Sequence, residues 1–330
     1  MAVHGVGRAR SVAPGVAVVG LRPEPLDDRF HSAQHNEPVL TRGRGQGRLI
    51  PAPLYALGAI ASVQIGATVA RHLFDYLGPA GTVFVRVAFG ALILLAITRS
   101  HQLQVVAWHW RSVMLFGLII AAMNLCFYEA IARLPLGIAV TIEFVGPLGV
   151  AIAGSRKALD FAWILMAATG VVMLSLTGGQ VTLLGVLYAL GAAAGWASYI
   201  LINQRVGRAV PGAGGLAFAL AIGALALAPF GLAGAGTHLL DARNLGMGLI
   251  VAILSTAIPF SLEFAALRRL SSRVFGILMS LEPAMGAAAG FVLLGQRLSP
   301  RDLLAILLVI LASAGATLTA PRPSTIQDVP

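Results

Sequence analysis

The dominant pattern in this sequence is a series of long apolar stretches separated by short polar segments. Between residues 51 and 320, most stretches approach the roughly 20 residues that an α-helix needs to cross a membrane. The pattern therefore predicts an all-α polytopic membrane protein with ten transmembrane helices. The expected helices lie near residues 53–71, 80–98, 112–132, 136–154, 159–177, 182–204, 213–232, 245–267, 272–294 and 301–319.

The composition supports this interpretation. Hydrophobic residues make up 58% of the chain and charged residues only 11%, whereas soluble domains carry roughly 45–50% apolar and about 25% charged residues. A soluble fold of this length cannot hide so much apolar surface, but a bilayer can. The 38 glycines fit as well, because glycine is more frequent in membrane helices than in soluble ones.

The first 50 residues differ from the rest of the chain. They contain seven arginines and no apolar run long enough to cross a membrane. We expect residues 1–50 to form a disordered cytoplasmic tail, with a regulatory or lipid-binding arm as the alternative. A short cytoplasmic tail is expected at 321–330, after two five-helix units at 51–178 and 179–320.

The distribution of positive charge predicts the orientation. The net charge of +10 would suggest a nucleic-acid partner in a soluble protein, but here the charges lie in short loops between apolar helices, so no nucleic acid is expected. Outside the first 50 residues, ten lysines and arginines fall on the side of the two termini and five on the other. The positive-inside rule therefore places both termini in the cytoplasm. The five residues on the opposite side are Arg71, Arg133, Arg243, Arg297 and Arg301.

The chain also contains an internal repeat. Residues 130–154 align without gaps on residues 266–290, which places Pro147 on Pro283. Because each repeat would hold five helices, an odd number, the two halves must enter the membrane from opposite sides. Inverted repeats of this kind are typical of secondary transporters.

Three ionisable residues lie deep within the predicted helices: Arg86, Glu143 and Glu282. Burying a charge at mid-membrane costs at least about 2.5–3.5 kcal/mol, so each requires a partner or a function. Glu143 lies one turn before Pro147, and Glu282 directly precedes Pro283, so both acids lie beside expected helix kinks, or hinges. We interpret them as a polar site for substrate or protons. The alternative is a buried ion pair that locks helix packing.

Other polar residues in the helices are candidates for lining the same pathway. They are Gln64, Asn124, Trp196, Tyr199, Asn203 and Ser280. Each has an alternative role as an interhelical hydrogen bond or an interfacial anchor. Glu129 and Glu263 lie nearer to helix ends, where a structural role is favoured. The Gly-x-x-x-Gly pairs at 191–195 and 286–290 offer smooth faces for helix contact, which leaves a homodimer possible without identifying one.

Cysteine and histidine usage excludes several classes of protein. Cys126 is the single cysteine, and the seven histidines form no metal-binding spacing, so we expect no metal site and no cofactor. No phosphate-binding Gly-x-x-x-x-Gly-Lys-Ser/Thr motif is present, which argues against an ATP-driven pump. The isolated glutamates lack the paired groups of a membrane-embedded enzyme, so we expect no enzymatic activity.

Several long segments resemble the EamA branch of the drug/metabolite transporter superfamily. They are SVQIGATVARHLF (62–74), RVAFGALIL (86–94), PLGIAVTIEFVGPLGVAIAGSRKALDF (135–161), LGAAAGWASYILINQR (190–205) and AILSTAIPFSLEFAALRRLSSRVFGILMSLEPA (252–284). The resemblance implies a multi-pass protein of the bacterial inner membrane that exports small neutral amino acids such as threonine and homoserine by proton antiport. Another metabolite or a drug remains an alternative cargo. The branch often has Leu-Gly-Glu after the ninth helix, where this chain has Gln296, so any role of that glutamate is in doubt here.

Overall fold

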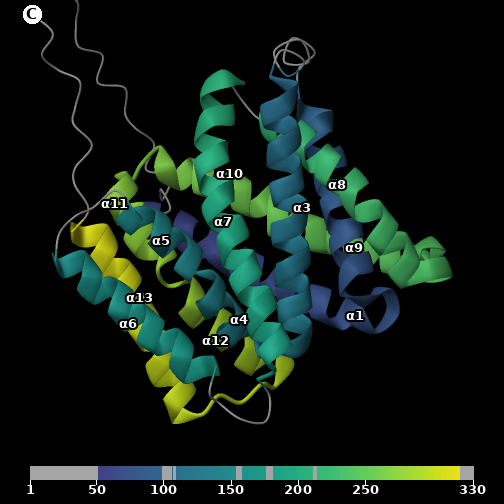
Figure 1. Cartoon of the computed structure of the whole chain (residues 1–330). Coiled ribbons are helices and arrows are strands. Elements are labelled where there is room, and N and C mark those ends of the chain that lie inside the picture. The colour runs from purple at the N-terminus through teal and green to yellow at the C-terminus, as the bar shows by residue number, and fades with distance from the viewer. Residues whose placement is uncertain are drawn as a thin grey trace, which may run out of the picture. The chain divides into compact units, whose positions relative to one another are not determined.

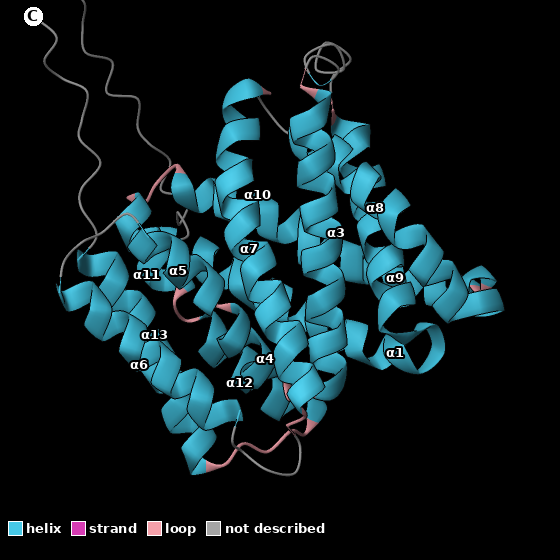
Figure 2. Ribbon diagram, viewed as in Figure 1, coloured by secondary structure: helices cyan, strands magenta, loops and turns pink. Residues whose placement is uncertain are grey.

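The computed structural model describes residues 51–98, 106, 109–153, 158–175, 181–210 and 214–319. The tails predicted at 1–50 and 321–330 lie outside these residues. Every regular element within them is a helix (Figure 2). In chain order the elements are α1 (Ala52–Ile97), α3 (Trp110–Arg133), α4 (Leu136–Glu143), α5 (Val145–Ala153), α6 (Ala158–Ser175), α7 (Leu183–Ala209), α8 (Gly214–Ala235), η2 (Gly236–Leu240), α9 (Ala242–Ala252), η3 (Ile253–Ala257), α10 (Ile258–Leu267), α11 (Ser272–Met279), α12 (Glu282–Leu294) and α13 (Pro300–Thr319).

Eight helical stretches of the described residues are long and apolar enough to cross a membrane. Ten separate spans were predicted, and the difference has two causes. The helices expected at 53–71 and 80–98 fall within one 46-residue element, α1, whose helical backbone is interrupted at Gly78, where φ is 65°, just before Pro79. The span expected at 159–177 is the shorter apolar helix Leu159–Leu174.

Two predicted spans are interrupted near their centres. The stretch 136–153 divides at Phe144 into α4 and α5, and the stretch 272–294 divides at Ser280 and Leu281 into α11 and α12. The stretch 242–267 contains a further irregularity, the π-helical turn η3. Such turns are frequent at functional sites.

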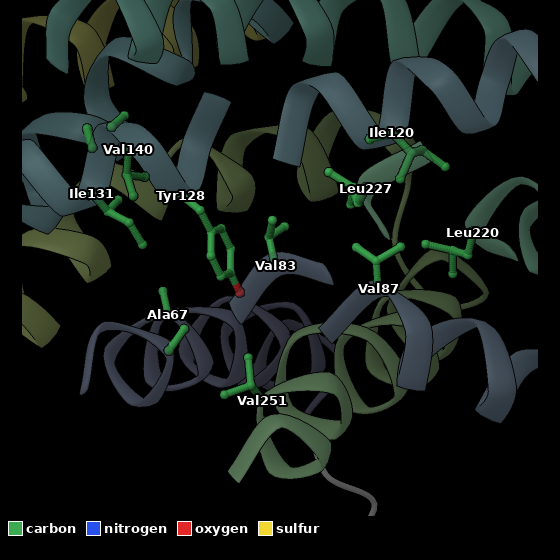
Figure 3. Packing of buried hydrophobic residues seen from close by; sticks show 14 of the residues in the cluster. Ala67, Val83, Val87, Ile120, Tyr128, Ile131, Val140, Leu220, Leu227 and Val251 are labelled. Carbon is green, nitrogen blue, oxygen red and sulfur yellow. The ribbon is translucent and has the colours of Figure 1, made fainter. Parts of the chain in front are cut away.

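The helices pack in a few extensive pairs. α1 is covered by α8, α9 and α10, while α3 packs against α7 and α8. The pairs α3–α7 and α6–α13 lie side by side in Figure 1. The largest apolar cluster joins α1, α3, α7 and α8, and Tyr128 projects into it beside Val83 (Figure 3).

Glycine permits the closest helix contacts. A Cβ atom at Gly117 would stand 2.6 Å from the carbonyl oxygen of Ala219, and one at Gly170 would stand 2.8 Å from that of Ala305. Small residues allow such approach in membrane proteins, where packing rather than water exclusion holds helices together. Large apolar side chains instead cover the outside, such as Phe161 at 76% exposure and Leu225 at 74%, as expected for a surface that faces lipid.

Candidate solute-binding site

Glu143 occupies the break between α4 and α5. Every residue of α4 is buried, and Glu143, its last residue, is only 9% exposed. Because Pro147 has no N–H to donate, the carbonyl of Glu143 receives no helical hydrogen bond from that position. A carboxyl group and a released carbonyl therefore share one interruption inside a buried helix.

Glu282 occupies the matching break between α11 and α12. It is the first residue of α12, it is 8% exposed, and Pro283 follows it. The neighbouring Ser280 is 1% exposed, and its hydroxyl lies 3.0 Å from the hydroxyl of Ser313 on α13. This serine pair ties the second break to the last helix.

These acidic residues lie within electrostatic range of one another and of a cation. Glu282 is repelled by the like charges of Glu143 and Glu263, and Glu143 is attracted by Arg86. These residues come from α12, α4, α10 and α1, so four elements contribute to one charged cluster. The sequence placed Arg86, Glu143 and Glu282 in such a site, but it favoured a structural role for Glu263.

Arg86 is held by neutral groups. Its guanidinium donates a hydrogen bond to the side-chain oxygen of Asn124 and lies 5.3 Å from the ring centroid of Tyr128. The amide nitrogen of Asn124 in turn donates to the carbonyl of Ile120 at 2.8 Å. Among the described residues, no carboxylate forms an ion pair with Arg86, and its buried Nε has no hydrogen-bond partner.

The remaining pathway candidates occupy different environments. Gln64 is 3% exposed, and its Oε1 is buried without a partner. This oxygen lies 3.3 Å from the point where Gly286 would carry a Cβ atom, one turn along α12 from Glu282. Trp196 packs edge-on against Phe144 with ring centroids 5.6 Å apart. Tyr199 packs on Phe116 and interacts electrostatically with Glu263, whereas Asn203 is exposed.

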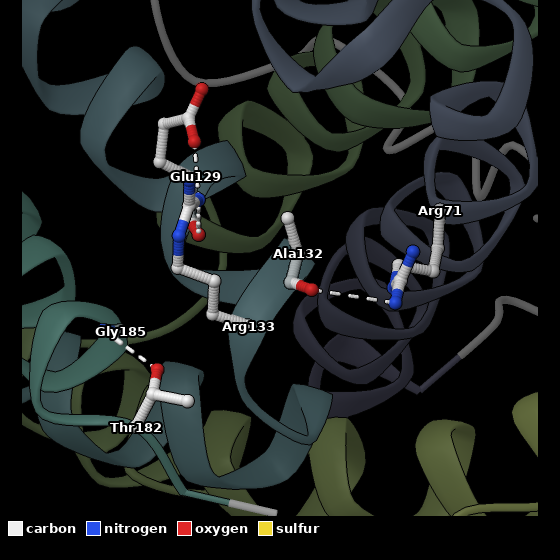
Figure 4. A network of polar contacts seen from close by, with 6 residues as sticks. All are labelled: Arg71, Glu129, Ala132, Arg133, Thr182 and Gly185. Atoms are coloured by element: carbon white, nitrogen blue, oxygen red, sulfur yellow. Dashed lines mark hydrogen bonds and ion pairs between the residues drawn. The ribbon is translucent and has the colours of Figure 1, made fainter.

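Glu129 belongs to a separate polar network at one end of α3 (Figure 4). It forms an ion pair with Arg133, one turn along the helix. Arg71 reaches the same end from α1 and donates to the carbonyl of Ala132 at 3.4 Å. A cavity of about 220 Å³ lies here, lined by Arg71, Ala132, Arg133, Leu134, Pro135 and Gln296. Within the described residues, no hydrogen bond or ion pair joins this network to Glu143 or Arg86.

Two members of the site were missed by sequence reasoning. Glu263 looked peripheral because it lies close to a predicted helix end, but the irregular stretch η3 and α10 brings it into range of Glu282 and Tyr199. The signal available was an unpaired glutamate four residues after Pro259. Tyr128 contacts Arg86 through its ring, and nothing in the local sequence distinguishes it from other apolar core residues.

Comparison with known proteins identifies the family. The model of the EamA-like transporter family matches residues 183–318. The threonine/homoserine exporter RhtA of Escherichia coli K12 is 43% identical over 276 residues, which cover 83% of this chain and 93% of that protein. The corresponding exporter of Salmonella typhimurium LT2 is 42% identical over 279 residues, or 84% and 94%. An uncharacterized transporter of Bacillus subtilis, YwfM, is 29% identical over 234 residues, or 67% and 78%.

A solved structure supports the fold independently. A crystal structure with 20% sequence identity superposes with a TM-score of 0.56 and covers 82% of this chain and 97% of that one. The named relatives are transporters rather than enzymes. Together with the apolar helices, they show that this multi-pass membrane protein belongs to the EamA-like transporter family of the drug/metabolite transporter superfamily.

Proposed function

We propose that this protein exports small neutral amino acids, threonine and homoserine foremost, across the bacterial inner membrane. The observation that carries the proposal is its 43% identity over 93% of a threonine/homoserine exporter. The charged cluster of Arg86, Glu143, Glu263 and Glu282 supports it, because a half-buried cation near two buried acids and a third, half-buried one suits a zwitterionic solute.

The proposed topology has ten crossings. At 1.5 Å per residue the 46 residues of α1 would extend about 69 Å, more than twice the hydrocarbon thickness. We infer that α1 crosses twice, turning at Gly78, and that α6 crosses beside α13. Residues 51–178 and 179–320 then form two five-helix units of opposite orientation, with both termini cytoplasmic.

The helix breaks support the duplication. α4 and α11 are both eight residues long, running over Leu136–Glu143 and Ser272–Met279. They coincide when residues 130–154 are aligned on residues 266–290. Glu143 falls at the end of the first helix, whereas Glu282 falls just beyond the second break. The two halves are thus alike in backbone and unlike in chemistry, which suits one asymmetric solute bound between them.

The roles within the site follow from charge. Arg86 has an unpartnered Nε and is the proposed ligand of the solute carboxylate. Glu143 or Glu282 receives the ammonium group, and the other carries the transported proton. Gln64, Asn124, Trp196 and Tyr199 line the pathway, and Pro147 and Pro283 serve as hinges. Because a positively charged ammonium group at one glutamate opposes a proton at the other, such a cluster can exchange one for the other in alternating access.

Transport by purified protein in liposomes tests this proposal. The measurement is efflux of a labelled amino-acid panel, including threonine, homoserine, lysine and aspartate, under an imposed pH gradient. We expect efflux of threonine and homoserine that follows the gradient and collapses when a protonophore is added. Efflux of another class of solute, or none that responds to the gradient, would contradict the proposal.

A further inference from the structure

α4 and α12 meet in one of the tightest contacts in the protein. A Cβ atom at Gly137 would stand 2.6 Å from the Cα atom of Ala287. One at Gly286 would stand 3.2 Å from a methyl group of Val140. The two helices therefore approach almost backbone to backbone, and they come from the two proposed halves of the chain.

Gln296 fastens this contact by a single hydrogen bond. α12 ends at Gly295, whose φ of 63° turns the chain so that the N–H of Gln296 bonds back to the carbonyl of Gly290 at 3.0 Å. The turn directs the side chain toward α4, where its Oε1 accepts a hydrogen bond from the N–H of Leu136 at 2.9 Å. This is the first N–H of α4, which has no partner within its own helix.

The helix pair that corresponds to α4 and α12 in the proposed repeat makes no such close contact. If α4 matches α11 and α5 matches α12, the counterpart of the α4–α12 contact is α5 against α11. Within the described residues these two helices share no comparable packing. Gly146 of α5 packs against Ala193 of α7, Gly276 of α11 packs against Thr317 of α13, and Gly149 has no heavy atom within 4 Å of its Cβ position.

We propose that the α4–α12 contact is a closed gate at one end of the solute pathway and that Gln296 is its latch. The inference rests on the proposed transport function, whose orientation places this gate at the periplasmic face. α4 is a short buried helix that begins at the latch and ends at Glu143. Releasing Gln296 therefore frees the helix that carries Glu143, so Gln296 is a positioning residue. Its role requires only a hydrogen-bond acceptor, which a glutamate also supplies.

A reversible cross-link tests the gate directly. The Cβ atom of Leu136 lies 3.5 Å from the position of a Cβ atom at Gly290, which is within the range of about 3.5–4.5 Å that a disulfide requires. A Cβ atom at Gly290 would also stand 2.5 Å from Oε1 of Gln296, so the end of that side chain must shift, and the cross-link tests the gate but not the latch. The double variant Leu136→Cys/Gly290→Cys is made with Cys126→Ser, which removes the single native cysteine. We expect oxidation to form the disulfide and stop exchange of labelled L-threonine, and reduction to restore it. Each single-cysteine variant serves as a control.

Two results would overturn the gate. One is full transport by the quantitatively cross-linked protein. The other is failure of the pair to cross-link under strong oxidation. If the unmodified protein transports no amino acid, that result contradicts the proposed function alone. Formation of the cross-link and the hydrogen–deuterium exchange described next do not require a transported solute, so they still test the gate and the latch.

Hydrogen–deuterium exchange tests the latch in the full chain. Gln296→Leu removes the acceptor at nearly constant size, and Gln296→Glu keeps it. We expect the segment 135–143 to take up deuterium about tenfold faster or more in the Leu variant, and at the wild-type rate in the Glu variant, because exchange follows the local opening equilibrium. Equal protection in all three proteins would refute the latch.

Discussion

The guanidinium of Arg86 donates its hydrogen bond to Asn124 and forms no ion pair with an acidic residue of the described chain. Glu143 interacts with Arg86 only at longer range, and Glu282 interacts with Glu143. The buried Nε of Arg86 has no hydrogen-bond partner, so it is available to an anionic ligand. We therefore propose that Arg86 belongs to a binding site, because in a packing device the opposite charges would be joined directly.

The first prediction concerns Arg86. Arg86→Lys keeps the charge but loses the planar fork and the Nε donor, so it cannot bind a carboxylate in two places. We expect its affinity for L-threonine to fall about tenfold or more, as is typical when a charge-assisted hydrogen bond of roughly 1.5–3 kcal/mol is lost. Equilibrium binding of labelled threonine to purified protein measures the change. Arg133→Lys is the matched control, because Arg133 belongs to the separate network with Glu129. Unchanged threonine binding in Arg86→Lys would show that Arg86 is not part of the site.

The second prediction concerns Gln64. Its Oε1 is buried without a partner, a defect that typically costs about 1–3 kcal/mol. We expect Gln64→Leu to raise the melting temperature. Because Gln64 is proposed to line the pathway, we also expect its unpartnered oxygen to accept the solute hydroxyl, so the variant should lose part of the preference for threonine over valine. Thermal unfolding and competition transport check the two effects. A stabilised variant with wild-type selectivity would show that Gln64 has no part in recognition.

The third prediction concerns close helix packing. A Cβ atom at Gly170 would stand 2.8 Å from the carbonyl oxygen of Ala305 on α13, whereas one at Gly207 would have no heavy atom within 4 Å. We expect Gly170→Ala to destabilise the protein by about 1–3 kcal/mol through overpacking. Gly207→Ala should be neutral or stabilising by up to about 1 kcal/mol through helix propensity. Thermal unfolding in detergent compares them, and an equal effect of both substitutions would show that α6 and α13 do not pack this closely.

The fourth prediction concerns topology. Reporter fusions after residues 100, 156, 206 and 270 should report a cytoplasmic position, and fusions after residues 180, 240 and 298 a periplasmic one. The reason is the excess of lysine and arginine on the side of the termini. The fusion after residue 100 is the decisive one. A cytoplasmic signal there means that α1 crosses the membrane twice, and a periplasmic signal means that it crosses once. A periplasmic signal there would disprove the ten-helix arrangement.

Much of the fold was predictable because hydrophobic length is a local property. The stretch predicted at 136–154 appears as α4 and α5, and the stretch at 272–294 as α11 and α12, with each break two or three residues before its proline. The interruption of α1 at Gly78 lies between the helices predicted at 53–71 and 80–98. What the sequence did not indicate was the π-helical turn at 253–257, which precedes the helix that carries Glu263.

The site was predictable in part for a related reason. Buried charges stand out in an apolar sequence, so Arg86, Glu143 and Glu282 were found without a structure. Asn124 was a candidate as well, but its bond to Arg86 was not predictable, nor was the contact of Tyr128, because both depend on the packing of α1 on α3. The bond between Gln296 and Leu136 joins segments 160 residues apart, and no local pattern indicates it.

The two buried glutamates at the helix breaks are central to the proposed proton-coupled transport. Glu143→Gln and Glu282→Gln keep the size and hydrogen bonding of the side chain but remove its ionisable proton. Each variant is compared with Glu129→Gln, which removes the same group from the structural pair with Arg133. All proteins are reconstituted in equal amounts, and thermal unfolding checks that each is folded.

The most direct measurement is efflux of labelled L-threonine driven by a pH gradient, set against counterflow exchange at constant pH in the same vesicles. We predict that Glu143→Gln and Glu282→Gln both lose gradient-driven efflux by about tenfold or more, as expected when a group essential to coupling is removed, with Glu143→Gln the more severe. The variant that lacks the proton carrier should keep exchange without a response to pH, and Glu129→Gln should behave as wild type. Wild-type efflux with wild-type pH dependence in both variants would contradict the account.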